Sequence, residues 1–345
     1  MRLISTRYLP LAVLTATMML AGCPKGGVPG SGDLPGGGKV PGGIPGGDCG
    51  EYATNDAGRK IKAFLDATKQ LDATVKQTVD VVGESCRMMG QELQMSAADL
   101  DGDTKTVCNK VIATIKDNLK VAIKPKAKLK IDYKPAVCTV DISATAKAAA
   151  ECEAKAEADV KVRCEGSCSG TCNGTCNGNC AGKAGTGGSG GQCNGQCEGT
   201  CEGSCSGGCE GSADVEASAE CRASAEVKAS ADVQCTEPEL NIEADAKIVV
   251  DKAKAEMTIA ALKRGLPKLL SVQARMRPLG AAFKTWAKSV ADLKGVVGDL
   301  KSALGDAYLC VSAQLTAAFG MLPSIQVNVE VSVEVSASAS GSAGI

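Results

Sequence analysis

The chain has 345 residues, a formal net charge of −1 and no histidine, and only 2% of its residues are aromatic. This composition offers no basic face interleaved with aromatic rings, so nucleic acid is not an expected partner. It also lacks the commonest general base and metal ligand. The 19 cysteines indicate an oxidising compartment or a metal-thiolate protein. No catalytic triad, phosphate loop or pair of catalytic acids stands out, and the sequence predicts a protein that is not an enzyme.

The first 22 residues have the pattern of an export leader. Two arginines precede the apolar run YLPLAVLTATMML, which is too short to span a membrane. The leader ends in Leu20-Ala21-Gly22-Cys23, which resembles the lipobox of bacterial lipoproteins. The resemblance implies cleavage before Cys23 and covalent lipid on that residue, with several acyl chains giving a stable membrane anchor. No Asp follows Cys23, so the family's sorting rules imply the outer membrane, on its periplasmic or surface side. The alternative is an ordinary secretory cleavage site.

After Cys23, residues 24–48 are mostly Gly and Pro, a composition that cannot bury enough apolar surface to order itself. Residues 23–48 are therefore predicted to be a lipidated tether, and the folded part is expected to begin at Cys49. The predicted segments beyond the tether are the first half of a helical base at 49–124, a hairpin at 125–248 with its tip near 181–192, the second half of the base at 249–322, and a C-terminal strand and tail at 323–345.

Fourteen of the eighteen cysteines that follow Cys23 form seven pairs, and the two residue numbers of each pair add up to 373. The pairs are Cys138–Cys235, Cys152–Cys221, Cys164–Cys209, Cys168–Cys205, Cys172–Cys201, Cys176–Cys197 and Cys180–Cys193. Glycines between the cysteines follow the same rule, and so do Ile131 with Ile242 and Tyr133 with Leu240. An equal sum indicates two antiparallel arms that fold back on each other about a glycine-rich tip.

The periodicity of the two arms favours strands. The stretch TAKAAAECEAKAEADVKVR has a composition typical of a helix, so a helical hairpin is the alternative. Apolar residues nevertheless occupy every second position over 138–164 and 213–235, which is the period of a strand. Opposed residues in an antiparallel ladder lie about 4.5–5.5 Å apart at Cα, within reach of a disulfide. The arms are therefore predicted to form a ribbon with disulfide rungs, roughly 180 Å long if fully extended.

Two further expectations follow from the ribbon. Its face rich in Ala, Val and Cys should be covered by another copy, by an envelope protein or by the chain itself. The alternative for the clustered cysteines is a thiolate metal site, because Cys without His suits soft metals. In a strand, however, cysteines four residues apart lie about 13 Å apart, too far to share one tetrahedral ion. No cofactor is therefore expected apart from the lipid on Cys23.

Helical periodicity predicts a bundle on both sides of the ribbon. The predicted segments are 57–97, 104–121, 249–276 with a kink at Pro267, an apolar stripe over 279–304, and 308–322. Four cysteines remain, Cys49, Cys86, Cys108 and Cys310, and they allow two bridges in three connectivities.

The C-terminal sequence IQVNVEVSVEVSASAS alternates again, as an edge strand does. It is predicted to pair with AKLKIDYK at 127–134, because Glu330 and Glu334 would face lysines, and the result would be a three-stranded root. If this pairing fails, the lysines of the run Lys120–Lys134 are the candidate site for anionic headgroups or polysaccharide.

The predicted fold class is α+β, with a helical bundle base and a long inserted antiparallel two-stranded ribbon cross-linked by disulfides. The predicted function is structural: a lipid-anchored cell-envelope protein whose rigid arm acts as a spacer or in assembly. The alternatives are a thiolate lipoprotein that binds or stores metal, and a membrane-active protein or adhesin.

Overall fold

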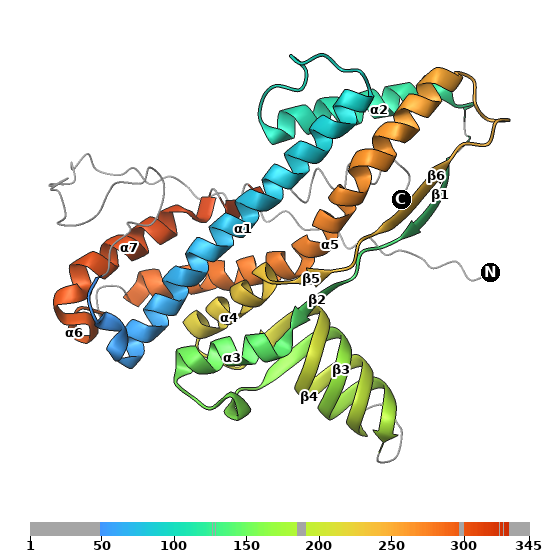
Figure 1. Ribbon diagram of the computed structural model, residues 1–345. Coiled ribbons are helices and arrows are strands. Elements are labelled where there is room, and N and C mark those ends of the chain that lie inside the picture. Colours follow the sequence, from blue (N-terminus) through green and yellow to red (C-terminus); the bar gives the residue numbers. More distant parts are fainter. Residues whose placement is uncertain are drawn as a thin grey trace, which may run out of the picture. The chain divides into compact units, whose positions relative to one another are not determined.

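The computed structural model describes residues 49–125, 127, 129–184, 191–296, 300–323, 325–326 and 328–330. For residues 158, 165–184, 191–207, 211, 212 and 296 it describes the backbone only. The fold combines long helices with small antiparallel sheets and holds several disulfides (Figure 1). The predicted leader, Cys23 and the tether lie outside the described residues.

Two helices form the first half of the body. Helix α1 (Asp56–Glu92) begins where Asn55 Oδ1 accepts a hydrogen bond of 2.7 Å from the Gly58 amide. Helix α2 (Thr104–Ala122) begins where the Asp103 carboxylate accepts one of 3.0 Å from the Thr106 amide. Such caps satisfy amides that have no partner within the helix. Both helices were predicted from their apolar periodicity, although α1 ends before residue 97.

Helix α5 (Lys252–Val296) is 45 residues long and contains Pro267 and Pro278. The sequence predicted a separate segment from residue 279, whereas the structure has one helix that runs through both prolines. Each proline removes one backbone hydrogen bond. Leu266 and Leu279, beside the two prolines, are fully buried, so packing on the body holds the helix across both positions.

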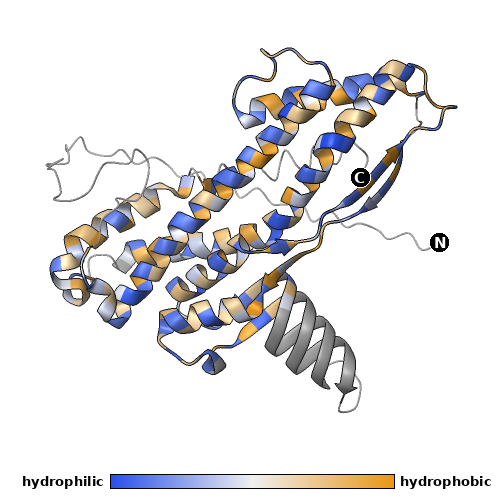
Figure 2. Ribbon diagram, viewed as in Figure 1, coloured by the Kyte–Doolittle hydropathy of each residue, from blue (hydrophilic) through white to orange (hydrophobic). Residues whose placement is uncertain are grey.

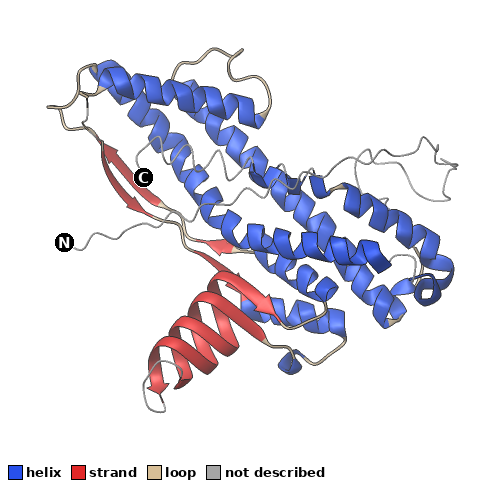
Figure 3. Cartoon of the chain, turned by 180° about the vertical axis from the view of Figure 1, so that it is seen from behind, coloured by secondary structure: helices blue, strands red, loops and turns tan. Residues whose placement is uncertain are grey.

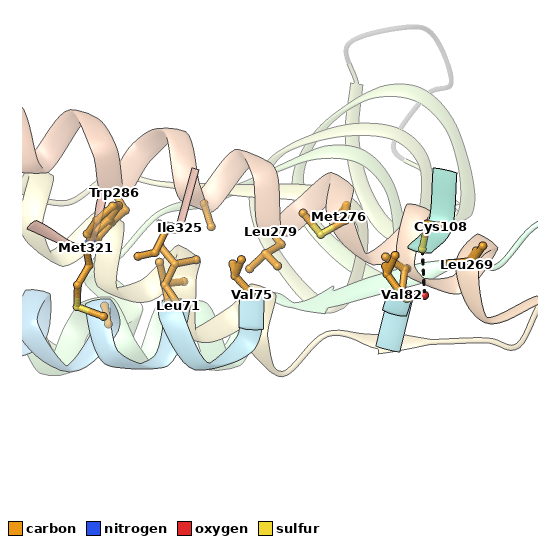
Figure 4. Close-up of a cluster of buried hydrophobic side chains, with 14 of the residues drawn as sticks. Leu71, Val75, Val82, Cys108, Leu269, Met276, Leu279, Trp286, Met321 and Ile325 are labelled. Carbon is orange, nitrogen blue, oxygen red and sulfur yellow. Dashed lines mark hydrogen bonds between the residues drawn. The ribbon is translucent and has the colours of Figure 1, made fainter. Parts of the chain in front are cut away.

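The main core lies between α1, α5 and the C-terminal helices α6 (Lys301–Leu304) and α7 (Tyr308–Gly320). The Phe64 ring stacks on Trp286 with centroids 6.1 Å apart, and it meets the edge of Phe319 at 6.4 Å. Trp286 Nε1 donates a hydrogen bond of 2.8 Å to Thr68 Oγ1. Figure 4 shows how side chains from α1 and α5 meet in this core, and Figure 2 shows the apolar stripes on the helices.

Short strands connect the body to the hairpin. Strand β1 (Lys130–Lys134) pairs with β6 (Glu239–Glu243), with Ile131 opposite Ile242. Strand β2 (Cys138–Asp141) pairs with β5 (Gln234–Cys235), with Cys138 opposite Cys235. These pairings have the register that the sum of 373 predicts. Short 3₁₀ turns lie at Tyr52–Thr54, Glu157–Asp159 and Gly305–Ala307.

Between these strands and the outer hairpin, the arms are helical. Helices α3 (Ile142–Glu153) and α4 (Ala219–Ala231) occupy segments that were predicted to be extended, so that prediction is wrong for both. The two helices still follow the sum of 373, because the numbers of Ile142, at the start of α3, and Ala231, at the end of α4, add up to 373. The buried residues of α3 include Ile142, Thr145, Ala149 and Cys152, whose steps of three and four residues are helical.

The alternation in α4 has a different cause from the one inferred. Two steps along a helix turn by about 200°, so alternate residues form two stripes on opposite faces. Ala223 and Val227 pack in the main core, whereas Ala225 and Ala229 pack in a second core beside the hairpin. Helix α4 lies between two cores, and apolar residues at every second position serve both.

The outer hairpin consists of β3 (Val162–Ala184) and β4 (Gly191–Val215), in a sheet of order β3-β4-β2-β5. Its ladder has two registers: Cys176 lies opposite Cys201 and also opposite Gly191, ten residues away along β4. A strand residue has one neighbour on each edge, so the ribbon is coiled and successive turns lie side by side. Figures 1 and 3 show this coil, whereas the sequence predicted a two-stranded ribbon with a single register.

The predicted C-terminal strand is not present where the structure describes the segment. Residues 325–326 and 328–330 are helical, and Ile325 is buried in the main core. Residues 331–345 lie outside the described residues. The described two-stranded sheet contains β1 and β6, so the predicted pairing of β1 with the tail is not part of it.

Candidate functional site

Three disulfides lie where the hairpin joins the body, a region that we call the hairpin root (residues 138–164 and 209–235). They are Cys138–Cys235, Cys152–Cys221 and Cys164–Cys209, with Cα–Cα distances of 4.0, 5.5 and 5.7 Å. Each bond joins the outgoing arm to the returning arm at equal distance from the tip, and all three are pairs that the sum of 373 predicts. The root is thus cross-linked at the strands β2 and β5, at the helix pair and at the start of the coil.

The Cys164–Cys209 bond shows how the coil differs from a flat ladder. The strand neighbour of Cys209 is Cys168, while Cys164 lies opposite Ala213. In a flat ribbon this offset of four residues would separate Cys164 and Cys209 by about 13 Å along the strand. Their Cα atoms are 5.7 Å apart and both residues are fully buried. The bond therefore joins residues that coiling brings together, and the prediction that bonded cysteines are directly opposed is wrong here.

A polar cluster fastens the helix pair to α1. Arg59 Nε donates a hydrogen bond of 3.1 Å to the carbonyl of Cys152 at the end of α3. Lys60 Nζ lies 3.1 Å from an Asp56 oxygen and 3.4 Å from a Glu153 oxygen. The charge of these two carboxylates raises the pKa of Lys60, although burial acts in the opposite direction.

Glu153 is the centre of this cluster. Its Oε1 accepts a hydrogen bond of 2.5 Å from the amide of Ser218, the residue that precedes α4. A carboxylate at a helix N-terminus satisfies a free amide and interacts favourably with the helix dipole. Burial raises the pKa of Glu153, but the hydrogen bond from the Ser218 amide and the charge of Lys60 outweigh burial and hold the pKa below its usual value. Glu153 thus caps α4 from the end of α3.

Further hydrogen bonds connect the returning arm to the body. Ser289 Oγ, on α5, donates a hydrogen bond of 2.8 Å to the carbonyl of Ala219. Arg275 Nη2, also on α5, donates one of 3.4 Å to the carbonyl of Val233. The returning arm is therefore held by α5, as the outgoing arm is held by α1.

The apolar face of the root is covered by the chain itself. Val140, Val162, Val215 and the Cys164–Cys209 bond are buried together with alanines of α3 and α4. At the root this face is therefore an internal core. The side chains of residues 165–184 and 191–207, farther along the coil, are not described.

The four cysteines whose pairing was open form Cys49–Cys310 and Cys86–Cys108, with Cα–Cα distances of 5.6 and 5.1 Å. The first bond joins the start of the described chain to α7, and the second joins α1 to α2. The tertiary structure selects this connectivity among the three possible ones.

The remaining predicted site residues have no described side chains. Cys23 lies outside the described residues, and so do the side chains of Cys168, Cys172, Cys176, Cys180, Cys193, Cys197, Cys201 and Cys205. No group of three potential metal ligands occurs among the residues whose side chains are described, and the cysteines of the coil are not among those residues.

The lysine run has acidic partners in the described part of the structure. Lys120 Nζ lies 3.0 Å from Asp117, Lys130 Nζ lies 3.7 Å from Glu243, and Lys134 Nζ lies 2.7 Å from Glu239. These pairs lower the positive charge that the run could offer to an anionic partner.

Sequence reasoning missed the role of Glu153 and Ser218. The available signal was the helical composition around Glu153, with Ser218 just before a second Ala-rich stretch, which is typical of a helix N-terminus. The strand interpretation hid that signal.

No helix among the described residues is both long and apolar enough to cross a membrane. Comparison with protein families, with curated proteins and with solved structures found no match to this chain.

Proposed function

We propose that the protein is a non-enzymatic lipoprotein of the cell envelope. In this proposal Cys23 carries the lipid anchor in the outer membrane, residues 24–48 act as the tether, and the body presents the coiled hairpin as a rigid arm for spacing or assembly. The lipobox-like sequence at Leu20–Cys23 supports the anchor.

The observation that carries the proposal is the cross-linking of the hairpin root. Three disulfides join the two arms, and the arms also contact α1 through Arg59 and α5 through Ser289. A hinge at the root would have to break several of these bonds together. Such a root suits a protein that presents its hairpin in one orientation.

Rigidity is tested with a pair of spin labels, one at Asn179 in β3 and one at Lys69 on α1. Distances are measured by pulsed electron resonance in the oxidised protein and in the variant Cys152→Ala/Cys221→Ala. We expect a narrow distance distribution in the oxidised protein and a broader one in the variant. A broad distribution in the oxidised protein would contradict the rigid arm.

Anchoring and metal binding need separate measurements. Metabolic labelling with palmitate should mark the wild-type protein and leave Cys23→Ser unlabelled and released from the membrane fraction. Thiol counting on unfolded, metal-stripped protein should find almost no free thiols. Many free thiols, together with zinc or copper released on stripping, would favour the metal-storage alternative.

A further inference from the structure

Charge is distributed unevenly between the body and the hairpin. Helix α5 contains ten basic and two acidic residues. The inserted segment 142–237 contains seven basic and fourteen acidic residues, although the whole chain is almost neutral. Segregation of charge of this kind favours one orientation of the molecule beside a charged surface.

Three cations of α5 form what we call the basic stripe: Arg277, Lys284 and Lys288. Steps of seven and four residues place them on one face of the helix, over roughly 16 Å at 1.5 Å per residue. All three side chains are exposed. Among the described residues, the ion pairs of α5 involve Lys252 and Arg264 and none of the three.

The part of α5 that carries the stripe packs on the hairpin root, where Ser289 donates a hydrogen bond to the Ala219 carbonyl and Arg275 donates one to the Val233 carbonyl. Lys294, farther along α5, places its Nζ 5.6 Å from the centroid of the Phe319 ring on α7. The first turn of α7 contains Cys310, which is bonded to Cys49, the residue that follows the predicted tether. Leu309 beside it is 78% exposed, so an apolar side chain is also available there.

We propose that the basic stripe binds the anionic headgroups of a lipid bilayer. The proposal rests on the proposed lipid anchoring, because a tether ending at Cys49 would hold the body near the bilayer. A Lys or Arg near an anionic surface strengthens binding roughly fivefold, so three together give about 100-fold. Asp292 follows Lys288 by one turn and would oppose binding at the end of the stripe.

The test uses residues 24–345 with Cys23 and its lipid absent, so that binding is independent of the anchor. Binding is measured by cosedimentation with vesicles of phosphatidylcholine containing 30% phosphatidylglycerol, and with vesicles of phosphatidylcholine alone. The test variant is Arg277→Gln/Lys284→Gln/Lys288→Gln. The matched control is Lys69→Gln/Lys116→Gln/Lys228→Gln, which removes the same charge from exposed positions on other helices.

We expect wild-type protein to bind only the anionic vesicles, with binding lost at high salt. The test variant should bind about 100-fold more weakly, and the control by no more than a few fold. Asp292→Asn should strengthen binding. Equal losses in the test and control variants would show a general effect of net charge and would overturn the proposal.

Two other outcomes would also overturn it. One is absence of binding by wild-type protein to anionic vesicles. The other is tight binding to a soluble anionic polysaccharide, such as alginate, without binding to the vesicles. Failure of palmitate labelling at Cys23 would contradict the anchor alone, so the two proposals fail separately. Far-ultraviolet circular dichroism and Trp286 fluorescence verify that each variant is folded.

Discussion

Replacing both cysteines of the Cys152–Cys221 bond with alanine should destabilise the protein by about 3.5 kcal/mol. The sequence separation of this bond is 69 residues, and that of the inner bond Cys164–Cys209 is 45. A loop of 69 residues alone would correspond to about 4.4 kcal/mol of chain entropy. The inner bond still joins the two arms in the variant, so Cys152–Cys221 closes an additional loop of only 24 residues, the difference between 69 and 45. A loop of this length corresponds to the value of about 3.5 kcal/mol.

The assay is equilibrium unfolding in urea, followed by the fluorescence of Trp286. This residue is the single Trp of the chain, it is fully buried, and its indole donates to Thr68, so its emission reports the main core. We expect a lower midpoint with little change in slope, since the surface exposed on unfolding stays similar. Hydrogen exchange should show lost protection in α3 and α4.

The matched control is Cys86→Ala/Cys108→Ala. Its separation of 22 residues corresponds to about 3.4 kcal/mol, almost the same loss, but α2 rather than the helix pair should lose protection. A loss below about 1 kcal/mol in Cys152→Ala/Cys221→Ala would refute the reasoning. It would show that the packing of α3 on α4 restricts the arms without the bond.

Four further substitutions test the packing and the polar cluster. Gly265→Ala should lower the free energy of unfolding in urea by about 1–3 kcal/mol, because a Cβ there would lie 2.3 Å from Met89 Cγ. A Cβ added at Gly280 meets nothing within 4 Å, so Gly280→Ala should stabilise α5 by about 0.5–1 kcal/mol. Trp286→Phe should lower the free energy of unfolding by about 2–3 kcal/mol, because the core loses volume and a buried hydrogen bond. Unfolding of this variant is followed by circular dichroism, and an unchanged stability would contradict the place of Trp286 in the core. Glu153→Gln should cost about 1–3 kcal/mol at pH 7. The pKa of Glu153 is lowered in the fold, so its contribution is present above the ordinary carboxyl pKa and disappears as pH falls through the folded value. A difference from wild type that persists in strong acid would contradict this role.

The sequence by itself determined how the two arms are matched at the strands β1, β2, β5 and β6. Cys138 pairs with Cys235 and Ile131 with Ile242 because arms of equal length keep a constant sum of residue numbers. It also determined the long helices, because apolar residues at steps of three and four must share a face to be buried. These patterns are local or symmetric, so they can be recognised without knowing what packs against them.

Only the tertiary structure decided the local conformation of the arms. Alternating apolar residues are compatible with a strand or with a helix between two cores, and the cores on both sides of α4 select the helix. Coiling likewise offsets the ladder so that Cys168 lies opposite Cys209 while Cys164 forms the bond. The Glu153 cap and the Cys49–Cys310 bond depend on where distant segments meet. Periodicity specifies which faces are buried, but it does not specify how many neighbours an element has, and here the number of neighbours decided between strand and helix.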